Sequence, residues 1–337
     1  MGAVLLTGAT GFVGREILSR FLDRDDRRVF ALVRAEDDNE AAGRLPGHAR
    51  LTAVAGDIER DGLGLSREAR ERMRSEVTTV LHCAASVSFD LPLDESRSVN
   101  VEGTQRMLEF ARSCPRLQRF SYVSTAYVAG EPDRVFREDE LAVGQRFRNP
   151  YERSKFEAEI ALRREGAGLP IQIFRPSIVV GDSRTGRTSS FNVLYGPLKA
   201  FARGAVPAIP ARRDSPVDIV PVDYVADRVQ ELVTHGPDGT FHLVAGRNAT
   251  TVGRLLEMSS EALDRPEPKV LSPRFYRRLV HPWLRRRYRG LRRMEVYFPY
   301  FWMRVRFDDR RLGPGPRVED YFHRLVRYAQ TARWGRG

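Results

Sequence analysis

Residues that mark secreted, metal-binding and membrane-spanning proteins are scarce in this sequence. Its only cysteines, Cys83 and Cys114, provide neither a disulfide framework nor a metal-ligand spacing, so no metal site is predicted. No apolar run approaches the roughly 20 residues that a membrane-spanning helix needs. A strand-like run begins at Ala3 and leaves no room for a signal peptide. We therefore expect a protein of the reducing cytoplasm.

Lysine is equally scarce. Only Lys155, Lys199 and Lys269 occur, so the net charge of +12 is carried almost entirely by arginine. The excess is local, because residues 274–311 hold 13 arginines against three acidic residues while the rest of the chain is close to neutral. The content of hydrophobic residues (42%) and of charged residues (30%) is typical of a soluble globular protein. Only residues 274–311 therefore call for an explanation of their charge.

In this arginine-rich segment, apolar residues of 275–291 recur at steps of three and four, which predicts an amphipathic helix interrupted at Pro282. Three interpretations stay open: packing on the rest of the protein, docking of an acidic partner, and peripheral membrane attachment. The aromatic residues of 297–302 fit an apolar channel or a surface anchor. Nucleic-acid binding is disfavoured, because no recognisable binding motif accompanies the charge. The oligomeric state is not readable from the sequence, and a homodimer is left open.

Short β-rich runs alternate with amphipathic stretches over the first 180 residues, which predicts βαβ units around a parallel sheet. The predicted helices are 13–22, 66–74, 101–113, 151–164 and 251–263, with a further turn and helix in 217–236. The predicted strands are 4–7, 29–33, 51–54, 79–82, 119–123 and 171–174, with an edge strand at 240–244. These elements fit an α/β fold with a doubly wound, Rossmann-like parallel sheet.

The composition changes after Gly181, where the chain becomes rich in glycine, serine, arginine and proline. We expect a nucleotide-binding domain formed by residues 1–181 and 217–246. A smaller, discontinuous C-terminal cap that binds substrate would then comprise residues 182–216 and 247–337.

A glycine-rich turn follows the first predicted strand and opens the first predicted helix. Glycines at this place permit a tight turn and a close approach of the backbone to a pyrophosphate, which the helix N-terminus would bind. The position between strand and helix makes this pattern specific for a dinucleotide. We assign to cofactor binding the residues Thr7, Gly8, Thr10, Gly11, Phe12, Val13 and Gly14.

The end of the second predicted strand indicates which dinucleotide binds. Arg34 lies 20 residues after Gly14, where proteins that prefer NAD place an acidic residue. An arginine there would meet a 2′-phosphate, so NADPH is predicted, with an ordinary surface arginine as the alternative. After the third strand, Asp57 is placed to accept a hydrogen bond from adenine, with Ile58 beside it, although a turn aspartate is an alternative. After the fourth strand, Ala84 and Ala85 would let the cofactor pass over the sheet edge.

Tyr151 and Lys155 are four residues apart at the start of a predicted helix and therefore share one helical face. A phenol titrates near pH 10, and a neighbouring ammonium would lower the pKa of Tyr151 toward the range that general acid–base catalysis requires. The fifth predicted strand ends just before, with two hydroxyls, Ser124 and Thr125, that compete to donate to the substrate oxygen. The unused hydroxyl would bond to backbone. Asn100 could cap a helix or make a structural bond that supports the lysine. We expect His82 and Cys83 to be packing residues.

Together these residues resemble the extended short-chain dehydrogenase/reductase superfamily: the glycine-rich turn, Gly56-Asp57-Ile58, the Ser-Thr strand end, Tyr-x-x-x-Lys and Arg175-Pro176-Ser177. The resemblance covers residues 3 to about 245. It favours Thr125 over Ser124, because Thr125 lies five residues before Gly130. It also implies that Pro176, Ser177 and Ile178 contact the cofactor, as do Tyr151 and Lys155.

Several stretches look like the fatty acyl-CoA reductase and thioester reductase branch of that superfamily, namely residues 31–34, 81–89, 123–128 and 218–224. The resemblance implies an acyl thioester substrate on coenzyme A or on an acyl carrier protein, as in lipid metabolism. NADPH would reduce it to the aldehyde, with a second reduction to the alcohol left open. The alternative is an NADP-dependent hydroxyl/ketone dehydrogenase or epimerase that acts on a sugar nucleotide or a steroid-like substrate.

Overall fold

A computed structural model describes residues 2–191, 193–204, 207–282 and 295–335, which form two compact units. Unit 1 comprises Met1–Gly130, Glu138–Pro176 and Val225–His242. Unit 2 comprises Glu131–Arg137, Ser177–Tyr224 and Leu243–Gly337. The roles expected for two such parts, nucleotide binding and substrate binding, stay predictions.

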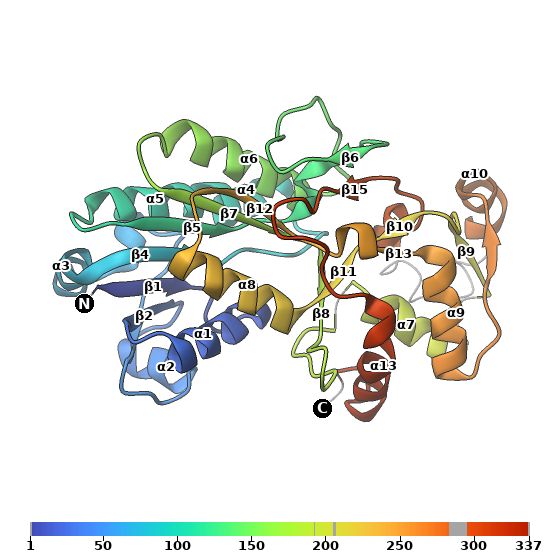
Figure 1. Ribbon diagram of the computed structural model, residues 1–337, viewed down its shortest axis with the longest axis horizontal. Coiled ribbons are helices and arrows are strands. Elements are labelled where there is room, and N and C mark those ends of the chain that lie inside the picture. Colours follow the sequence, from blue (N-terminus) through green and yellow to red (C-terminus); the bar gives the residue numbers. More distant parts are fainter. Residues whose placement is uncertain (1, 192, 205–206, 283–294, 336–337) are drawn as a thin grey trace. The chain divides into compact units, whose positions relative to one another are not determined.

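Unit 1 is built on a seven-stranded sheet in the order β12-β7-β5-β4-β1-β2-β3, with parallel pairing throughout from β7 to β3 (Figure 1). Its strands are short and mostly buried because helices cover both faces, which is the usual setting of parallel sheets. The α/β, doubly wound fold is therefore confirmed, and β12 is the predicted edge strand. The strands are β1 (Ala3–Thr7), β2 (Arg28–Val33), β3 (Leu51–Ala55), β4 (Val77–His82), β5 (Arg119–Val123), β7 (Ile171–Pro176) and β12 (Gly239–Leu243).

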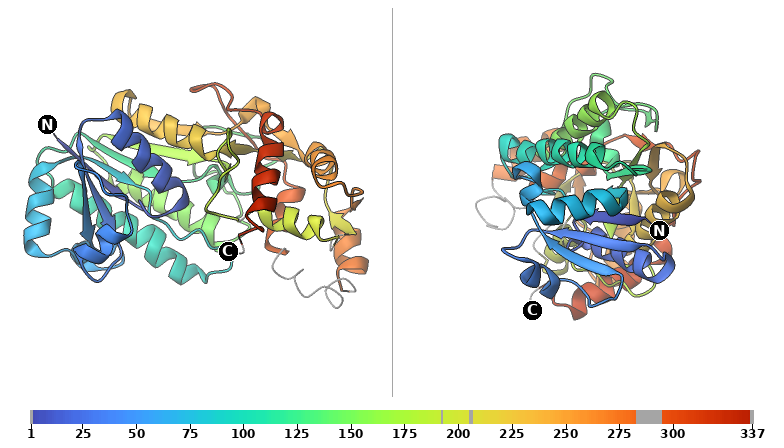
Figure 2. Two further views of the ribbon diagram at one scale, coloured as in Figure 1. Left: turned by 90° about the horizontal axis from the view of Figure 1, so that it is seen from below. Right: turned by 90° about the vertical axis from the view of Figure 1, so that its left-hand side faces the viewer.

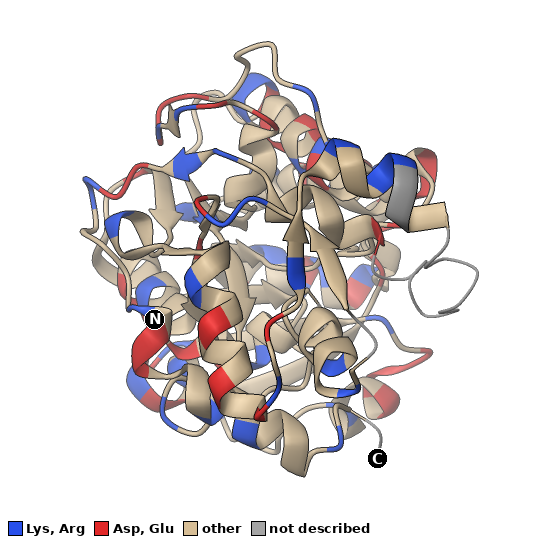
Figure 3. Ribbon diagram, turned by 90° about the vertical axis from the view of Figure 1, so that its right-hand side faces the viewer, with Lys and Arg blue, Asp and Glu red and all other residues tan. Residues whose placement is uncertain are grey.

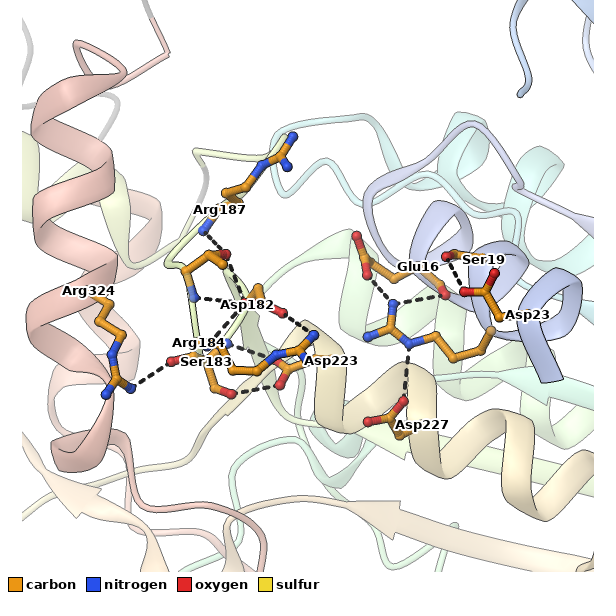
Figure 4. Close-up of polar contacts among 12 residues, drawn as sticks. Glu16, Ser19, Asp23, Asp182, Ser183, Arg184, Arg187, Asp223, Asp227 and Arg324 are labelled. Carbon is orange, nitrogen blue, oxygen red and sulfur yellow. Dashed lines mark hydrogen bonds and ion pairs between the residues drawn. The ribbon is translucent and has the colours of Figure 1, made fainter. Parts of the chain in front are cut away.

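Helices α1 and α8 lie on one side of this sheet, and α3, α4, α5 and α6 lie on the other (Figures 1 and 2). An ion pair links the first two, because Arg20 of α1 contacts Asp227 of α8 at 3.1 Å and also Glu16 of its own helix (Figure 4). The bounds are α1 (Phe12–Arg24), α2 (Asp38–Gly43), α3 (Arg67–Glu76), α4 (Leu93–Arg97), α5 (Gly103–Ser113), α6 (Pro150–Glu165) and α8 (Val222–His235).

Unit 2 has only pairs of short strands in its described part, and residues of these strands and of helices together form its core. Ser183 donates two hydrogen bonds to Asp223, and Arg324 donates to the Ser183 carbonyl at 2.9 Å (Figure 4). The helices are α7 (Tyr195–Ala202), α9 (Val252–Leu263), α10 (Pro273–Phe275) and α13 (Phe322–Thr331). The strand pairs are β6 (Val135–Phe136) with β15 (Arg306–Phe307), β8 (Ile178–Val180) with β11 (Ile219–Pro221), β9 (Ala208–Pro210) with β14 (Lys269–Leu271), and β10 (Pro216–Val217) with β13 (Thr250–Thr251).

The arginine-rich segment is described only in part, because residues 283–294 of the predicted amphipathic helix lie outside the described residues. Before them, Tyr276 is fully buried and its ring packs edge-on against Phe298 at 5.7 Å. Tyr300 is also buried. The described aromatic residues thus contribute to the core of unit 2. No helix in the described residues is long and apolar enough to span a membrane.

Candidate active site

The candidate site begins at the turn after β1, where the strand order reverses between β1 and β4. Ligands of open α/β sheets bind outside the carboxyl ends of the strands at such a point. Gly8 has a φ of +76°, and a Cβ atom there would lie 2.7 Å from the Ala84 nitrogen. A Cβ atom at Gly14 would lie 2.0 Å from the Gly8 carbonyl oxygen. Neither position accepts a side chain, so the turn presents backbone alone.

Helix α1 begins at this turn. Its N-cap, Gly11, makes no side-chain capping bond, and the first turn of the helix contains no acidic residue. The Gly11 N–H donates to the Gly8 carbonyl at 2.9 Å and closes the turn. The first N–H groups of a helix need partners and its dipole favours an anion, so this arrangement fits the pyrophosphate of a dinucleotide. Cofactor contacts of Thr10, Phe12 and Val13 stay predictions.

The residues predicted to bind the adenosine half follow β2 and β3. The Arg34 side chain is 76% exposed and lies 3.5 Å from the Glu59 carboxylate. One oxygen of Asp57 accepts a hydrogen bond from the Glu59 N–H at 2.9 Å, as a turn aspartate does. Ile58 is buried in the core of unit 1. The predicted contacts of Asp57 and Ile58 with adenine are not tested by these bonds.

Thr7 is bound to the segment that follows β4. Its hydroxyl oxygen accepts hydrogen bonds from the N–H groups of Cys83 at 3.2 Å and Ala84 at 3.0 Å, and it contacts His82 Nδ1 at 2.8 Å. Burial raises the pKa of the Cys83 thiol to about 11, so this cysteine is not an activated nucleophile. Ala84 and Ala85 follow at the carboxyl edge of the sheet, both half-buried. Thr7 thus has a structural role beside its predicted contact with the cofactor.

Helix α6 carries Tyr151 and Lys155. Its N-cap, Asn149, accepts a hydrogen bond from the Glu152 N–H at 2.9 Å, and proline occupies the first helical position. Glu152 also forms an ion pair with Arg148 at 3.0 Å, with both side chains buried. These contacts fix the start of the helix and therefore the position of Tyr151.

The Lys155 ammonium is held at the carboxyl end of β5. Its nitrogen donates to the Val123 carbonyl at 2.7 Å and lies 4.1 Å from the centre of the Tyr122 ring. The side chain is almost fully buried. Burial lowers the pKa of Lys155 to about 7, although the neighbouring Cys83 and Glu159 act in the opposite direction. The lysine therefore exchanges its proton near neutral pH.

The expected lowering of the pKa of Tyr151 is wrong in direction. Burial raises the pKa of Tyr151 to about 12, and the hydrogen bond with the Thr125 hydroxyl offsets only part of that rise. The physical reason is that burial of the phenol disfavours its charged form more than the neighbouring groups favour it. The Tyr151 ring stacks on Phe89 with 5.7 Å between ring centres. A phenol with this pKa keeps its proton at neutral pH and can act as a proton donor.

Both candidate hydroxyls at the end of β5 are buried. Thr125 caps the short 3₁₀ helix that follows, because its oxygen accepts from the Tyr127 N–H at 3.3 Å, and it donates to the Pro176 carbonyl at 3.4 Å. Ser124 Oγ has no hydrogen-bond partner within the part of the chain that the structure describes. The hydroxyl bonded to backbone is thus the favoured Thr125, whereas we expected the other one. Thr125 is also the hydroxyl in contact with Tyr151.

Asn100 is neither a helix cap nor a direct partner of the lysine. It lies inside the π-helical turn Ser98–Glu102, because α4 runs directly into this turn and the helix has already begun. Its side chain accepts from the Ser86 N–H at 2.8 Å and donates to the Ser86 carbonyl at 3.0 Å and to Ser154 Oγ at 2.9 Å. Ser154 precedes Lys155, so Asn100 ties the loop after β4 to the helix that carries the lysine.

The last three predicted cofactor residues divide between the units. Pro176 ends β7 in unit 1, whereas Ser177 and Ile178 belong to unit 2. The Ser177 N–H donates to the Leu243 carbonyl at 3.2 Å, and Ile178 begins β8. All other predicted site residues lie in unit 1, and the contacts of Ser177 and Ile178 with the cofactor stay predictions.

Sequence reasoning missed a buried ionic network behind Lys155. Arg175 and Glu159 are fully buried and form an ion pair of 2.7 Å. Arg175 also donates to the Glu138 carbonyl at 3.3 Å, and the Glu138 carboxylate accepts from the His242 N–H at 2.8 Å. The available signal was the spacing of four residues between Lys155 and Glu159, which places an acidic group one helical turn behind the lysine.

Comparison with known proteins identifies the family. A family model described as male sterility protein, an NAD-binding family, matches residues 6–229, more than half of the chain. The chain belongs to this family. The match shows an NAD(P)-binding family, and the resemblance to the fatty acyl-CoA reductase and thioester reductase branch is confirmed.

Individual relatives agree with this membership. Carboxylic acid reductase of Mycobacterium tuberculosis (strain ATCC 25618 / H37Rv) is 32% identical over 283 residues, covering 72% of this chain and 24% of that protein. Fatty acyl-CoA reductase wat of Drosophila melanogaster is 27% identical over 266 residues, covering 65% of this chain and 52% of that protein. The chain therefore spans about a quarter of the first relative and about half of the second. The solved terminal R domain from the myxalamid PKS-NRPS biosynthetic pathway has a TM-score of 0.85 at 26% identity, covering 99% of this chain and 92% of that one.

Proposed function

We propose that this member of the male sterility protein family uses NADPH to reduce an acyl thioester, on coenzyme A or on an acyl carrier protein, to the aldehyde. The observation that carries the proposal is the grouping of Thr125, Tyr151 and Lys155 at the carboxyl end of β5, in the same unit as the glycine turn. The likeness to a carboxylic acid reductase and a fatty acyl-CoA reductase favours a thioester over a ketone or a sugar nucleotide.

The nicotinamide, when bound, supplies hydride to the thioester carbonyl carbon. Tyr151 is protonated at neutral pH, because its pKa is about 12, and its hydroxyl donates to the oxyanion that develops. Thr125, whose hydroxyl interacts with the same phenol, is expected to help stabilise this oxyanion. Transfer of the phenol proton gives a thiohemiacetal. Its C–S bond then breaks as its O–H proton is lost, which releases the aldehyde and the thiol.

Lys155 supplies a positive charge beside the reacting groups. Its nitrogen is bound to the Val123 carbonyl, so the ammonium is held at the strand end where the reaction takes place. Being buried, it interacts strongly with any negative charge that forms near it. Its role is therefore to stabilise the phenolate left after proton transfer and to bind the nicotinamide ribose.

The choice of NADPH over NADH rests on Arg34. This arginine follows β2, is largely exposed and has Glu59 as a distant ion-pair partner at 3.5 Å. A guanidinium in this place fits a 2′-phosphate. Replacing it (Arg34→Ala) should raise the KM for NADPH about 10-fold or more and leave the KM for NADH unchanged. Arg28→Ala, at the other end of β2, is the matched control. Equal losses with both cofactors would argue against this role.

Unit 2 supports an acidic substrate carrier. Arg274, Arg277 and Arg278 are exposed around the buried Tyr276, and the Arg277 guanidinium lies 5.0 Å from the Trp302 ring. Figure 3 marks the basic positions of the described residues in blue and the acidic ones in red. Such a surface fits the phosphates of coenzyme A or an acidic carrier protein. Peripheral membrane contact through residues 274–311 and a homodimer have no comparable support and stay predictions.

The decisive experiment is NADPH oxidation by the purified chain with a matched set of substrates. An acyl-CoA and the same acyl group on a carrier protein are compared with a ketone and a nucleoside diphosphate sugar. We expect turnover with a thioester only, one equivalent of free thiol per NADPH, and an aldehyde that a hydrazine reagent captures. A second equivalent of NADPH without aldehyde would identify the alcohol as product. Turnover with the ketone or the sugar nucleotide alone would exclude thioester reduction.

A further inference from the structure

A chain of buried hydrogen bonds crosses unit 1 between the glycine turn and helix α6, and none of the steps above uses it. Its centre is His82, the last residue of β4, whose side chain is fully buried. His82 Nδ1 lies 2.8 Å from Thr7 Oγ1, and Nε2 lies 3.1 Å from Thr104 Oγ1. Both threonine side chains are buried as well. The imidazole thus bridges the end of β1 and the start of α5.

The proton positions in these hydrogen bonds can be assigned from the groups that are able only to donate or only to accept. Thr7 Oγ1 accepts from the N–H groups of Cys83 and Ala84, which can only donate, so its own proton goes to His82 Nδ1. Thr104 Oγ1 gives its proton to the Asn100 carbonyl at 2.7 Å, which can only accept. Thr104 must therefore accept from His82, and the imidazole is neutral with its proton on Nε2.

The charges around the ring agree with this assignment. Lys155 is the cation that acts on His82, while the Cys83 thiol beside it stays protonated and the Tyr122 ring stacks on it with 5.6 Å between centres. Burial, and then Lys155, lower the pKa of His82 to about 3. The imidazole therefore keeps one protonation state over the whole range in which enzymes work.

On the Thr104 side, these hydrogen bonds continue to helix α6, which carries Lys155. Thr104 binds the Asn100 carbonyl, and the Asn100 side chain binds Ser86 and Ser154. The Tyr122 ring that stacks on His82 is also the ring beneath the Lys155 nitrogen. Two routes thus lead from the imidazole to α6, one by hydrogen bonds and one through an aromatic ring.

We propose that His82 is a positioning residue: as a neutral imidazole protonated on Nε2, it locks the turn of Gly8 to the helix of Lys155 through Thr7 on one side and Thr104 on the other. The proposal rests on the proposed reductase function. It assumes that the Thr7 side of these hydrogen bonds supports the part of the site that binds the cofactor, and that the Thr104 side supports the part that carries out the chemical step. Breaking the Thr7 end should weaken cofactor binding. Breaking the Thr104 end should slow the chemical step with cofactor binding retained.

The first test needs no variant. Nitrogen-15 NMR of the histidine side chains in the full chain should show one imidazole that remains neutral and protonated on Nε2 from about pH 5 to about pH 9. His82→Asn identifies that signal by its loss. A cationic His82 anywhere in that range, or a proton on Nδ1, would overturn the assignment.

The second test separates the two ends. Thr104→Val, which keeps the shape and removes the hydroxyl, should lower kcat about 10-fold and change the Kd of NADPH by less than about 2-fold. Thr7→Val should raise that Kd about 10-fold. Thr104→Ser should restore kcat. Thr78→Val is the control, because Thr78 is buried on the same strand as His82 and its hydroxyl donates to the Ala3 carbonyl, at the opposite end.

If Thr104→Val and Thr78→Val lowered kcat and thermal stability equally, the hydrogen bonds of His82 would contribute no more than ordinary packing does. That result would overturn the proposal. The NMR signature and the NADPH affinities are measured without any thioester. If the chain reduced no thioester at all, the proposed function would fail while these two readouts still decided the role of His82.

Discussion

The two units differ in what holds them together and in what they offer to ligands. Unit 1 has one continuous parallel sheet, and nearly all the predicted site residues lie at its carboxyl edge. The described part of unit 2 has isolated strand pairs of two or three residues around α7, α9 and α13, and it includes the exposed arginines of the C-terminal segment. Chemistry that needs fixed distances belongs on a sheet, whereas recognition of a charged carrier needs only a surface of suitable sign. The contrast therefore predicts large effects on turnover in unit 1 and small, salt-dependent effects in unit 2.

The largest effect is expected at the proton donor. Tyr151→Phe should lower kcat about 1,000-fold, because it removes the hydroxyl that protonates the oxyanion in the proposed reaction. The Kd of NADPH, measured by fluorescence, should stay within about 2-fold, since the ring that stacks on Phe89 is retained. Phe89→Leu serves as the control for the loss of stacking alone. If the variant kept more than about 10% of the turnover of the unsubstituted protein, another residue would have to be the proton donor.

The next effect concerns stability. Arg175→Met leaves the carboxylate of Glu159 buried without its cation and should lower the free energy of unfolding by about 4 kcal/mol. Arg213→Met in unit 2 breaks exposed ion pairs with Glu257 and Glu267 and should cost less than about 1 kcal/mol. Urea unfolding at neutral pH measures both. Similar losses at the two sites would remove the distinction between a buried ionic network and surface pairs.

Titration of Lys155 gives a prediction of intermediate size. Its pKa is lowered from 10.5 to about 7, so the ammonium is lost as the pH rises above that value. The kcat/KM should therefore fall by up to about 10-fold per pH unit above about pH 7, while Tyr151, with a pKa of about 12, remains protonated. A profile that stayed flat to about pH 9 would contradict the depressed pKa of Lys155.

The lowered pKa of Lys155 should also make the free energy of unfolding depend on pH. Between about pH 7 and the unfolded pKa of 10.5, the unfolded chain binds a proton that the folded chain does not. The free energy of unfolding should then rise with pH by up to about 1.4 kcal/mol per unit from this group. Lys155→Met removes that contribution, and the difference between the two stability profiles isolates it.

The smallest effect is expected on the surface of unit 2. Replacing Arg274, Arg277 and Arg278 together by glutamine should raise the KM for an acidic thioester carrier about 3-fold to 10-fold and leave kcat unchanged. The effect should shrink as salt rises, because exposed charges are screened. Replacing Arg67, Arg70 and Arg72 on α3 of unit 1 provides a charge-matched control. A loss of kcat instead would show that these arginines act in the chemistry.

The sheet of unit 1 could be predicted because its strands are short apolar runs and most of them alternate with amphipathic helices. Each of the six strands predicted in the first 180 residues is present, with ends within two residues for all of them. Helix α13 was missed, because no element was assigned to that stretch although Phe322, Leu325, Val326 and Ala329 are buried at helical spacing. Strand pairs such as β10 with β13 could not be predicted, because two residues carry no periodicity and pair only through tertiary contacts.

At the site, the sequence predicted which residues gather but not how they are bonded. The positions of Gly8 and Gly14 follow from the close backbone contacts that any side chain would obstruct. The high pKa of Tyr151 could not be foreseen, because spacing on a helix reveals neighbours and not burial. Of the two alternatives for Asn100, the helix cap is wrong for a similar reason: a polar residue before a helix resembles a cap until the preceding turn is known to be helical.

The late arrival of β12 in the chain has a consequence for synthesis. Gln172 of β7 donates to the Leu232 carbonyl at 2.8 Å, and Phe174 packs against Phe241 with 6.1 Å between ring centres. These partners follow β7 in the sequence only after residues 177–224, which belong to unit 2. On a ribosome β7 is therefore an unprotected edge strand until α8 and β12 emerge. A nascent chain stalled before that point should be the species that aggregates or recruits a chaperone.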